Sequence, residues 1–414
     1  MNPSQALYDF APTLQLMLLG LLLAVGPLAW VWLRNRKASL PQRLRALTFL
    51  TLFLTFDLVL FGAFTRLTDS GLGCPDWPGC YASASPIGAK AQISAEQTAM
   101  PTGPVTHQKA WIEMIHRYAA SGVGVLILVL AVMSWVHRQQ LHRRLRISPW
   151  WPTLTLVWVC LQGAFGALTV TMKLFPAIVT MHLLGGMALL ALLQSQATRY
   201  RLGTGLGDDH SAGQMLLTTR RWLIAGFVLL WVQIALGGWV STNYAVLACN
   251  EFPMCQGQWV PPMAMREGFE IWRSLGQTAA GNNITLPALT AIHVVHRMSA
   301  FIVFVVLGVA AWKMYRHAPP YSDVRTAAWW IAALLLWQLV TGLSNVVLGW
   351  PLLAAVSHTG GAAGLVIVIT GVLSAARLQA ASVLYDERGG VPQSTAQGLG
   401  HINSSYNTLS GGVR

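Results

Sequence analysis

Residues 289–312 read LTAIHVVHRMSAFIVFVVLGVAAW, an apolar run whose ionisable residues, His293, His296 and Arg297, all lie near its start. A helix rises about 1.5 Å per residue, so roughly 20 apolar residues are enough to cross the ~30 Å hydrocarbon core of a bilayer. This run is therefore predicted to span a membrane as a helix.

Similar apolar runs recur along the whole chain. The predicted spans are residues 13–33, 46–64, 111–136, 149–171, 175–197, 220–242, 289–312, 326–349 and 352–376. Hydrophobic residues make up 54% of the 414 residues and charged residues only 10%, which is too few charges to cover the surface of a water-soluble domain. The predicted fold class is an all-α, polytopic membrane protein. The first run is not expected to be a cleaved signal peptide, because its basic cluster follows the apolar residues.

The chain carries a formal net charge of +13, and its basic residues are unevenly placed. Most of them fall in four clusters between the runs, at 34–45, 138–146, 199–221 and 313–325. With nine spans these clusters share one side, while the side with the two longest loops has few basic residues. The positive-inside rule then predicts an outer N-terminus and a cytoplasmic C-terminus. The charge indicates topology and not a nucleic-acid partner.

Equivalent residues recur 175 to 180 positions apart, which reveals an internal repeat. The pairs are Gly62 and Gly237, Cys74 and Cys249, Pro78 and Pro253, Cys80 and Cys255, His116 and His296, Gln162 and Gln338, Gly166 and Gly342, and His182 and His358. Both halves run in the same direction across the membrane, so the repeat is parallel. It predicts two tandem four-helix bundles related by a pseudo-twofold axis, with the helix at 13–33 as an extra N-terminal transmembrane helix.

The repeat and the charge clusters together predict five segments. These are an extra helix with a cytoplasmic basic linker (1–45), a first four-helix half (46–199), a cytoplasmic linker (200–219), a second half (220–378) and a cytoplasmic tail (379–414). The tail is rich in Gly, Ser, Gln and Asn and is predicted to be disordered. The outer segments 82–106 and 257–286 are predicted to be irregular loops.

Four histidines lie inside predicted spans, where ionisable residues are costly and are candidates for function. His116, His182, His296 and His358 occupy one span each, two in each half, at a similar depth near the predicted outer side. Two histidines that face each other across a bundle can supply both axial ligands of a heme iron. Glycines after His182 and His358 would leave room for the macrocycle, although close helix packing also explains them. The pattern favours two heme sites side by side over four hydrogen-bonded core histidines.

Two cysteine pairs lie in the predicted outer loops. Cys74 and Cys80 bracket PDWPG, and Cys249 and Cys255 bracket NEFPM. This spacing can close a small disulfide loop in an oxidising compartment. A metal site is the alternative, although the spacing departs from zinc patterns and nearby histidines are lacking. Cys160, inside a span, is predicted to be a small core residue.

The two halves differ beside the first histidine of each. The first half reads EMIHR at 113–117 and the second HVVHR at 293–297, so Glu113 and His293 are equivalents. Glu113 lies one helical turn from His116 on the same face, where a carboxylate can shuttle protons or stabilise a developing cation. The alternative is that Glu113 has no catalytic role and lies near the start of its helix because the helix dipole stabilises a negative charge there.

Three further ionisable residues in the spans are singled out. Arg117 and Arg297 each follow a candidate ligand histidine and are candidates to pair with heme propionates. Asp57 lies inside the second span and is expected to pair with an Arg or a His.

These residues together resemble the heme A synthase family. The matching motifs are GAFTRLTDSGLGCPDWP at 62–78, EMIHR at 113–117, HLLGG at 182–186, HVVHR at 293–297 and SHTGG at 357–361. The resemblance covers about residues 46–376, and the combination is far more specific than a lone ExxHR. The extra helix at 13–33 and the second cysteine pair depart from the family pattern.

The resemblance implies an enzyme of the bacterial inner membrane that oxidises the C8 methyl group of heme O to a formyl group, by successive hydroxylations, to give heme A. It implies a substrate site in the first half, with His116 and His182 as iron ligands and Glu113 as the catalytic residue. It implies a heme b cofactor in the second half, held by His296 and His358. The implied partners are heme O synthase, assembly factors of a terminal oxidase and membrane lipid; a homo-oligomer is compatible with it.

Two other functions fit the same residues. A heme-binding carrier or electron-transfer protein would hold heme without turning over heme O. A heme-free transporter would purify without colour.

Overall fold

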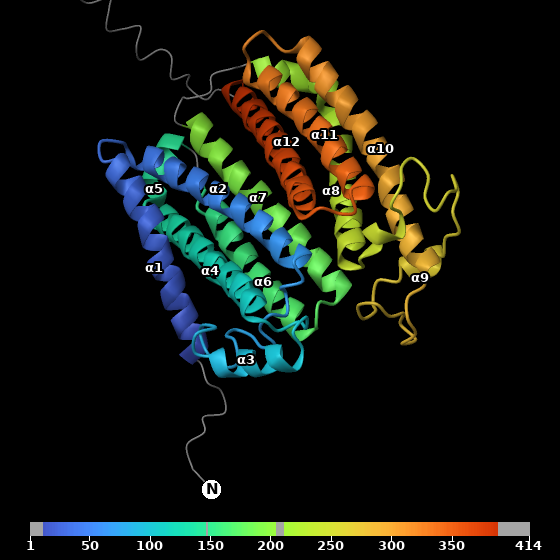
Figure 1. Cartoon of the computed structure of the whole chain (residues 1–414). Helices are drawn as coiled ribbons and strands as arrows, with labels where there is room; N and C mark the ends of the chain where they lie inside the picture. The colour runs from blue at the N-terminus through green and yellow to red at the C-terminus, as the bar shows by residue number, and fades with distance from the viewer. Residues whose placement is uncertain (1–10, 146–147, 204–210, 388–414) are drawn as a thin grey trace, which may run out of the picture.

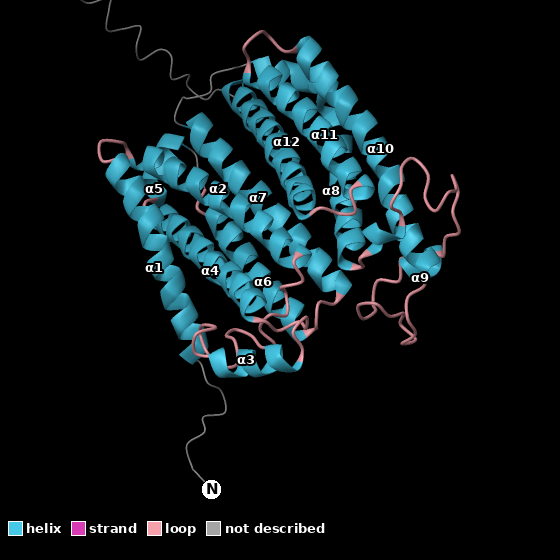
Figure 2. Cartoon of the chain, viewed as in Figure 1, coloured by secondary structure: helices cyan, strands magenta, loops and turns pink. Residues whose placement is uncertain are grey.

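The computed structural model describes residues 11–145, 148–203 and 211–387, and within these ranges all regular structure is helical (Figure 2). The long helices are α1 (Ala11–Arg34), α2 (Leu40–Leu67), α4 (His107–Val136), α6 (Trp150–Thr171), α7 (Pro176–Gly203), α8 (Ser211–Thr242), α10 (Leu286–His317), α11 (Asp323–Val347) and α12 (Leu352–Glu387). The sequence predicts a disordered tail from residue 379, but α12 continues as a helix to Glu387, so the structure corrects this boundary. The rest of the predicted tail, after residue 387, and part of the 200–219 linker lie outside the described residues.

Nine helices in the described ranges are long and apolar enough to cross a membrane, and they coincide with the nine predicted spans. Large apolar side chains such as Leu22, Val305 and Trp329 are more than half exposed on their surfaces. Lipid tails solvate such side chains as well as a protein core does, so the outer surface of the helices can stay apolar. The prediction of an all-α, polytopic membrane protein is confirmed.

Eight of the nine long helices, all except α1, form two groups of four with the same pattern of contacts (Figure 1). In the first group α2 contacts α4 and α7, and α6 contacts the same two helices. In the second, α8 and α11 each contact α10 and α12. The groups meet where α12 packs against α2 and α7, and α7 against α8. The domain boundaries and the tandem-bundle symmetry of the two groups remain predictions.

Repeat-equivalent residues touch each other where the two groups meet. A nitrogen of Arg66 donates to the carbonyl oxygen of Ser241 at 2.6 Å, and the Tyr244 hydroxyl donates to Asp69. Both pairs are 175 positions apart. Two equivalent residues can touch only close to the axis that relates them, so these contacts support the predicted pseudo-twofold relation.

The structure corrects two expectations about local structure and adds one short helix. The segment 82–106 is not wholly irregular, because it contains α3 (Lys90–Ala99), which packs against α4. The segment 257–286 is irregular except for the single turn α9 (Met265–Gly268). The basic residues after α4 form a further short helix, α5 (Arg138–Leu145).

Cys160 is exposed and free rather than a core residue. Most of α6 faces away from the protein, and in a membrane that surface is covered by lipid. A small apolar thiol side chain therefore gains no clear advantage from burial inside the bundle at this position.

The extra N-terminal helix packs against α4, the helix that carries His116. Gly20 makes the approach possible: a Cβ atom at this position would lie 2.6 Å from the Cβ of Ser121, whereas a Cβ atom at Gly26 would meet nothing within 4 Å. Small residues at such crossings let helix backbones approach closely in lipid.

We expect Gly20→Ala to separate α1 from α4 and to lower the free energy of unfolding by about 1–3 kcal/mol, the usual cost of overpacking. Gly26→Ala, on the same helix, is the control and should be neutral or stabilising by up to ~1 kcal/mol. Denaturation of the two variants in the same detergent measures the difference, and equal midpoints would contradict the packing argument.

Candidate functional site

The four predicted histidines are brought together in two pairs, one in each group of helices. His116 on α4 lies within electrostatic range of His182 on α7, and His296 on α10 lies within range of His358 on α12. The helices α4 and α10 begin before the predicted spans, so His116 and His296 lie further from the helix starts than expected. The sequence predicts that the two histidines of each half lie near each other, and the structure has this arrangement.

Each histidine ring packs against a glycine of a neighbouring helix. A Cβ atom at Gly62 would lie 3.1 Å from His116 Nε2, and one at Gly237 would lie 3.0 Å from His296 Cε1. On the other side of each bundle, a Cβ atom would lie 3.5 Å from His182 Cε1 if built at Gly166 and 3.3 Å from His358 Cε1 if built at Gly342. The four contacts form two repeat-equivalent sets.

Motif reading did not indicate that these glycines lie against the rings. The sequence identified Gly62, Gly166, Gly237 and Gly342 as markers of the repeat, and Gly62 also as the first residue of a family motif. The available signal was that a glycine recurs at the same place in the helix that faces each histidine. A larger side chain there would meet the imidazole, so the glycines set where each ring can lie.

Polar side chains contact the rings in the second group of helices. Thr341 Oγ1 lies 2.9 Å from His358 Nδ1, and Gln233 Nε2 lies 3.0 Å from His296 Nδ1. Gln338 donates to the main-chain carbonyl of His358 at 2.7 Å. In the first group, His182 Nδ1 is buried and has no hydrogen-bond partner within the described ranges.

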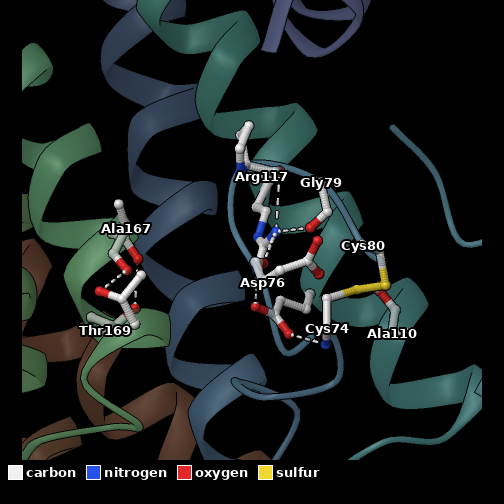
Figure 3. A network of polar contacts seen from close by, with 12 residues as sticks. Cys74, Asp76, Gly79, Cys80, Ala110, Arg117, Ala167 and Thr169 are labelled. Carbon is white, nitrogen blue, oxygen red and sulfur yellow. Dashed lines mark hydrogen bonds and ion pairs between the residues drawn. A yellow bond between two sulfur atoms is a disulfide. The ribbon is translucent and has the colours of Figure 1, made fainter. Parts of the chain in front are cut away.

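The first disulfide loop is tied to the helix of His116 (Figure 3). Cys74 and Cys80 are bonded, and the Cys74 N–H donates to Glu113 Oε2 at 2.8 Å. Arg117 forms an ion pair with Glu113 and donates to three carbonyl oxygens of the loop, those of Asp76, Pro78 and Gly79. Both Glu113 and Arg117 are buried, so these charge-assisted bonds lie in a poorly solvated place.

The second disulfide loop is held in the same way. Cys249 and Cys255 are bonded, and Arg297 donates to the carbonyl oxygens of Cys249, Glu251 and Met254 at 3.0–3.3 Å. His293 takes the place of Glu113 and accepts from Arg297 Nε at 3.2 Å. Both predicted disulfides are confirmed, and the alternative of a metal site fails because these sulfur atoms are paired with each other.

Three expected roles look different in the structure. The guanidinium groups of Arg117 and Arg297 are engaged by loop carbonyls, and their contact with propionates stays a prediction. Glu113 directs its carboxylate to the loop and to Arg117. Asp57 is exposed and forms no ion pair within the described ranges, so the expected partner is not found.

The chain matches the family model COX15-CtaA, described as cytochrome oxidase assembly protein, over residues 45–370. The chain belongs to this family. The matched range contains both histidine pairs and both disulfide loops, and it leaves out α1. That α1 is an addition to the family core remains a prediction.

Relatives that carry the name heme A synthase are similar over most of their length. That of Shewanella oneidensis is 36% identical over 320 residues, which is 77% of this chain and 92% of the relative. That of Halalkalibacterium halodurans is 26% identical over 310 residues, 73% of this chain and 86% of the relative. That of Symbiobacterium thermophilum is 27% identical over 345 residues, 80% of this chain and 94% of the relative.

We expect Arg117→Gln to loosen the first disulfide loop and leave the second one protected, because the variant loses the ion pair and most of the donors to the loop carbonyls. Arg297→Gln should have the converse effect and serves as the matched control. The measurement is the rate at which each disulfide becomes alkylated under mild reduction, resolved by mass mapping. Equal rates at both loops in both variants would show that the arginines do not hold the loops.

Proposed function

We propose that this chain oxidises heme O to heme A in the membrane, with a second heme as a resident cofactor. The observation that carries the proposal is the pair of half-buried histidines repeated in both helix groups, in a chain that is related throughout its core to proteins named heme A synthase. A carrier without chemistry of its own would need only one such site, so the duplication favours an enzyme with a substrate heme and a cofactor heme.

The residues present fit heme. Each helix group supplies two imidazoles, the usual nitrogen ligands of a six-coordinate heme iron. The glycine beside each ring leaves space where a side chain would otherwise stand, and apolar helices surround the site. We assign His116 and His182 to the substrate heme O, and His296 and His358 to heme b. When bound, the heme b iron supplies an electron-transfer centre.

The chain's own residues position the substrate and control water. The first disulfide loop, held by Arg117 and Glu113, lies at the end of α4 that carries His116 (Figure 3). In this place it can cover the substrate site and exclude water. Oxidation of a methyl group releases protons, and the Glu113 carboxylate is the acidic group one helical turn from His116. Electrostatic stabilisation by such a group is stronger in a poorly solvated site than in water.

The proposal places the protein in a bacterial inner membrane, with both heme sites toward the outer side and the C-terminus in the cytoplasm. The basic clusters of the sequence support this orientation. Heme O is hydrophobic, so we propose that heme O synthase delivers it within the membrane. Assembly factors of a terminal oxidase would receive the product.

Co-expression with heme O synthase tests the function. We expect membranes with this chain to accumulate heme A, and His116→Ala or His182→Ala to abolish it. His296→Ala and His358→Ala should deplete heme b while the protein is still made. The measurement is chromatographic identification of hemes B, O and A extracted from the purified protein. Bound heme without any heme A would favour the carrier, and a colourless protein would favour a transporter.

Glu113→Gln separates the catalytic and structural roles of this carboxylate. Glutamine can still accept from the Cys74 N–H but cannot ionise, so the loop should stay closed while proton handling is lost. We expect the variant to retain heme b and bind heme O, yet to form little heme A. Alkylation of Cys74 and Cys80 is the control for loop closure. Heme A at the wild-type level would leave Glu113 only its role as a partner of Arg117.

A further inference from the structure

The internal repeat allows the surroundings of the two histidine pairs to be compared position by position. Helices α2 and α8 match at a spacing of 175 through Gly62 and Gly237, and α6 and α11 match at 176 through Gly166 and Gly342. At these spacings Thr341 is equivalent to Phe165, and Gln233 is equivalent to Leu58. Both polar residues that contact a ring in the second half are thus apolar in the first half.

The hydrogen bonds of Thr341 indicate which nitrogen of His358 is free. The Thr341 hydroxyl donates its hydrogen to the carbonyl oxygen of Trp337 at 2.7 Å. While that hydrogen is engaged, the hydroxyl oxygen can only accept in its 2.9 Å contact with His358 Nδ1, and the contact then favours the tautomer with the proton on Nδ1. With the proton on Nδ1, Nε2 keeps its lone pair and is the nitrogen available to a metal.

Gln233 provides a second polar contact on the opposite ring. Its amide nitrogen lies 3.0 Å from His296 Nδ1 and 3.1 Å from the main-chain carbonyl of His296. Its oxygen is buried without a partner within the described ranges. The amide nitrogen donates to the ring when Nδ1 carries no proton, and it keeps its bond to the His296 carbonyl. With the proton on Nδ1, the amide must turn its oxygen to the ring and give up the bond to that carbonyl.

The first half lacks both side-chain contacts. Phe165, next to the glycine that faces His182, packs instead with the apolar cluster around Phe175 and Trp239. His182 Nδ1 is left buried without a partner in the described part of the chain. His116 differs from His182, because it has a hydrogen bond to the backbone of Leu58. Within the described ranges neither ring has a hydrogen bond to a side chain.

We propose that Thr341 and Gln233 are positioning residues that hold the second histidine pair on a permanent heme, and that Phe165 leaves His182 of the first pair without such a bond so that its heme can be exchanged. The inference rests on the proposed function, because only a substrate heme must enter and leave. It explains how one site can retain its heme while the other releases it, although the two sites are similar and bind the same class of ligand.

Hydrogen bonds to the outer nitrogen of a ligand histidine orient the ring and raise its basicity, and their loss typically costs roughly 10- to 100-fold in metal affinity. A more basic imidazole favours ferric over ferrous iron. Removal of the Thr341 hydroxyl should therefore both weaken heme b binding and raise the midpoint potential of that heme.

The first experiment replaces Thr341 in the full-length protein. We expect Thr341→Val, which keeps the shape and removes the hydroxyl, to release heme b to apomyoglobin roughly 10- to 100-fold faster and to raise its midpoint potential. Thr341→Ser restores the acceptor and should stay near the wild type. Ser344→Ala removes a hydroxyl of the same helix that bonds only Val340, and it should change neither quantity.

The second experiment introduces the missing contact into the first half. The Gly166–His182 and Gly342–His358 contacts share the Cε1 atom, at 3.5 and 3.3 Å, but the next ring atom is Nε2 at Gly166 and Nδ1 at Gly342. A threonine at 165 therefore bonds His182 Nδ1 once that ring has turned over to the orientation of His358. We expect Phe165→Thr to slow the release of the first-half heme to apomyoglobin relative to Phe165→Val, which has the same size without the hydroxyl. The comparison removes the effect of the lost aromatic ring.

The outcomes separate this inference from the proposed function. A wild-type protein that binds no heme would overturn both. A wild-type protein that makes heme A, with equal heme release and potential in Thr341→Val and Thr341→Ser, would overturn the inference alone. Equal release from Phe165→Thr and Phe165→Val would show that the first site is exchangeable for another reason.

Discussion

The contact between a histidine ring and a glycine of the facing helix occurs four times, and the arrangement of both candidate sites depends on it. In lipid, helices pack through close approach of small residues, and a glycine gives a neighbouring side chain room against the backbone. Here that side chain is an imidazole each time. The glycine that lets two helices pack closely is therefore also the residue that leaves room for the candidate ligand ring. A larger residue at Gly62 or Gly237 would either push the helices apart or turn the ring away.

The disulfide loops depend on the same helices. Arg117 and Arg297 lie one residue after His116 and His296, and each satisfies carbonyl oxygens of a loop that has no regular structure of its own. Buried carbonyl groups without partners are costly, and a guanidinium group can satisfy several of them at once. The loop and the candidate ligand histidine are therefore held by the same turn of helix.

Duplication gave the chain two sites that could diverge separately. The contacts between an arginine and a disulfide loop occur in both halves. In contrast, Glu113 of the first half is replaced by His293 in the second, and Phe165 is replaced by Thr341. The shared contacts are those that maintain the fold. The differences lie next to the histidines, where a change alters ligand behaviour without altering helix packing.

The nine spans, the disulfide pairs and the grouping of the histidines could be predicted from the sequence alone. Each depends on a local or repeated pattern: apolar length, cysteine spacing in an outer loop, and equivalent positions in two halves. Tertiary structure decided the rest. Arg117 and Arg297 were expected at propionates but contact loop carbonyls, because the loops fold back over α4 and α10. Thr341 and Gln233 carried no motif, and their contacts with His358 and His296 exist only because α11 packs on α12 and α8 on α10. A hydrogen bond between helices depends on their relative rotation and depth, and no pattern within one helix specifies these.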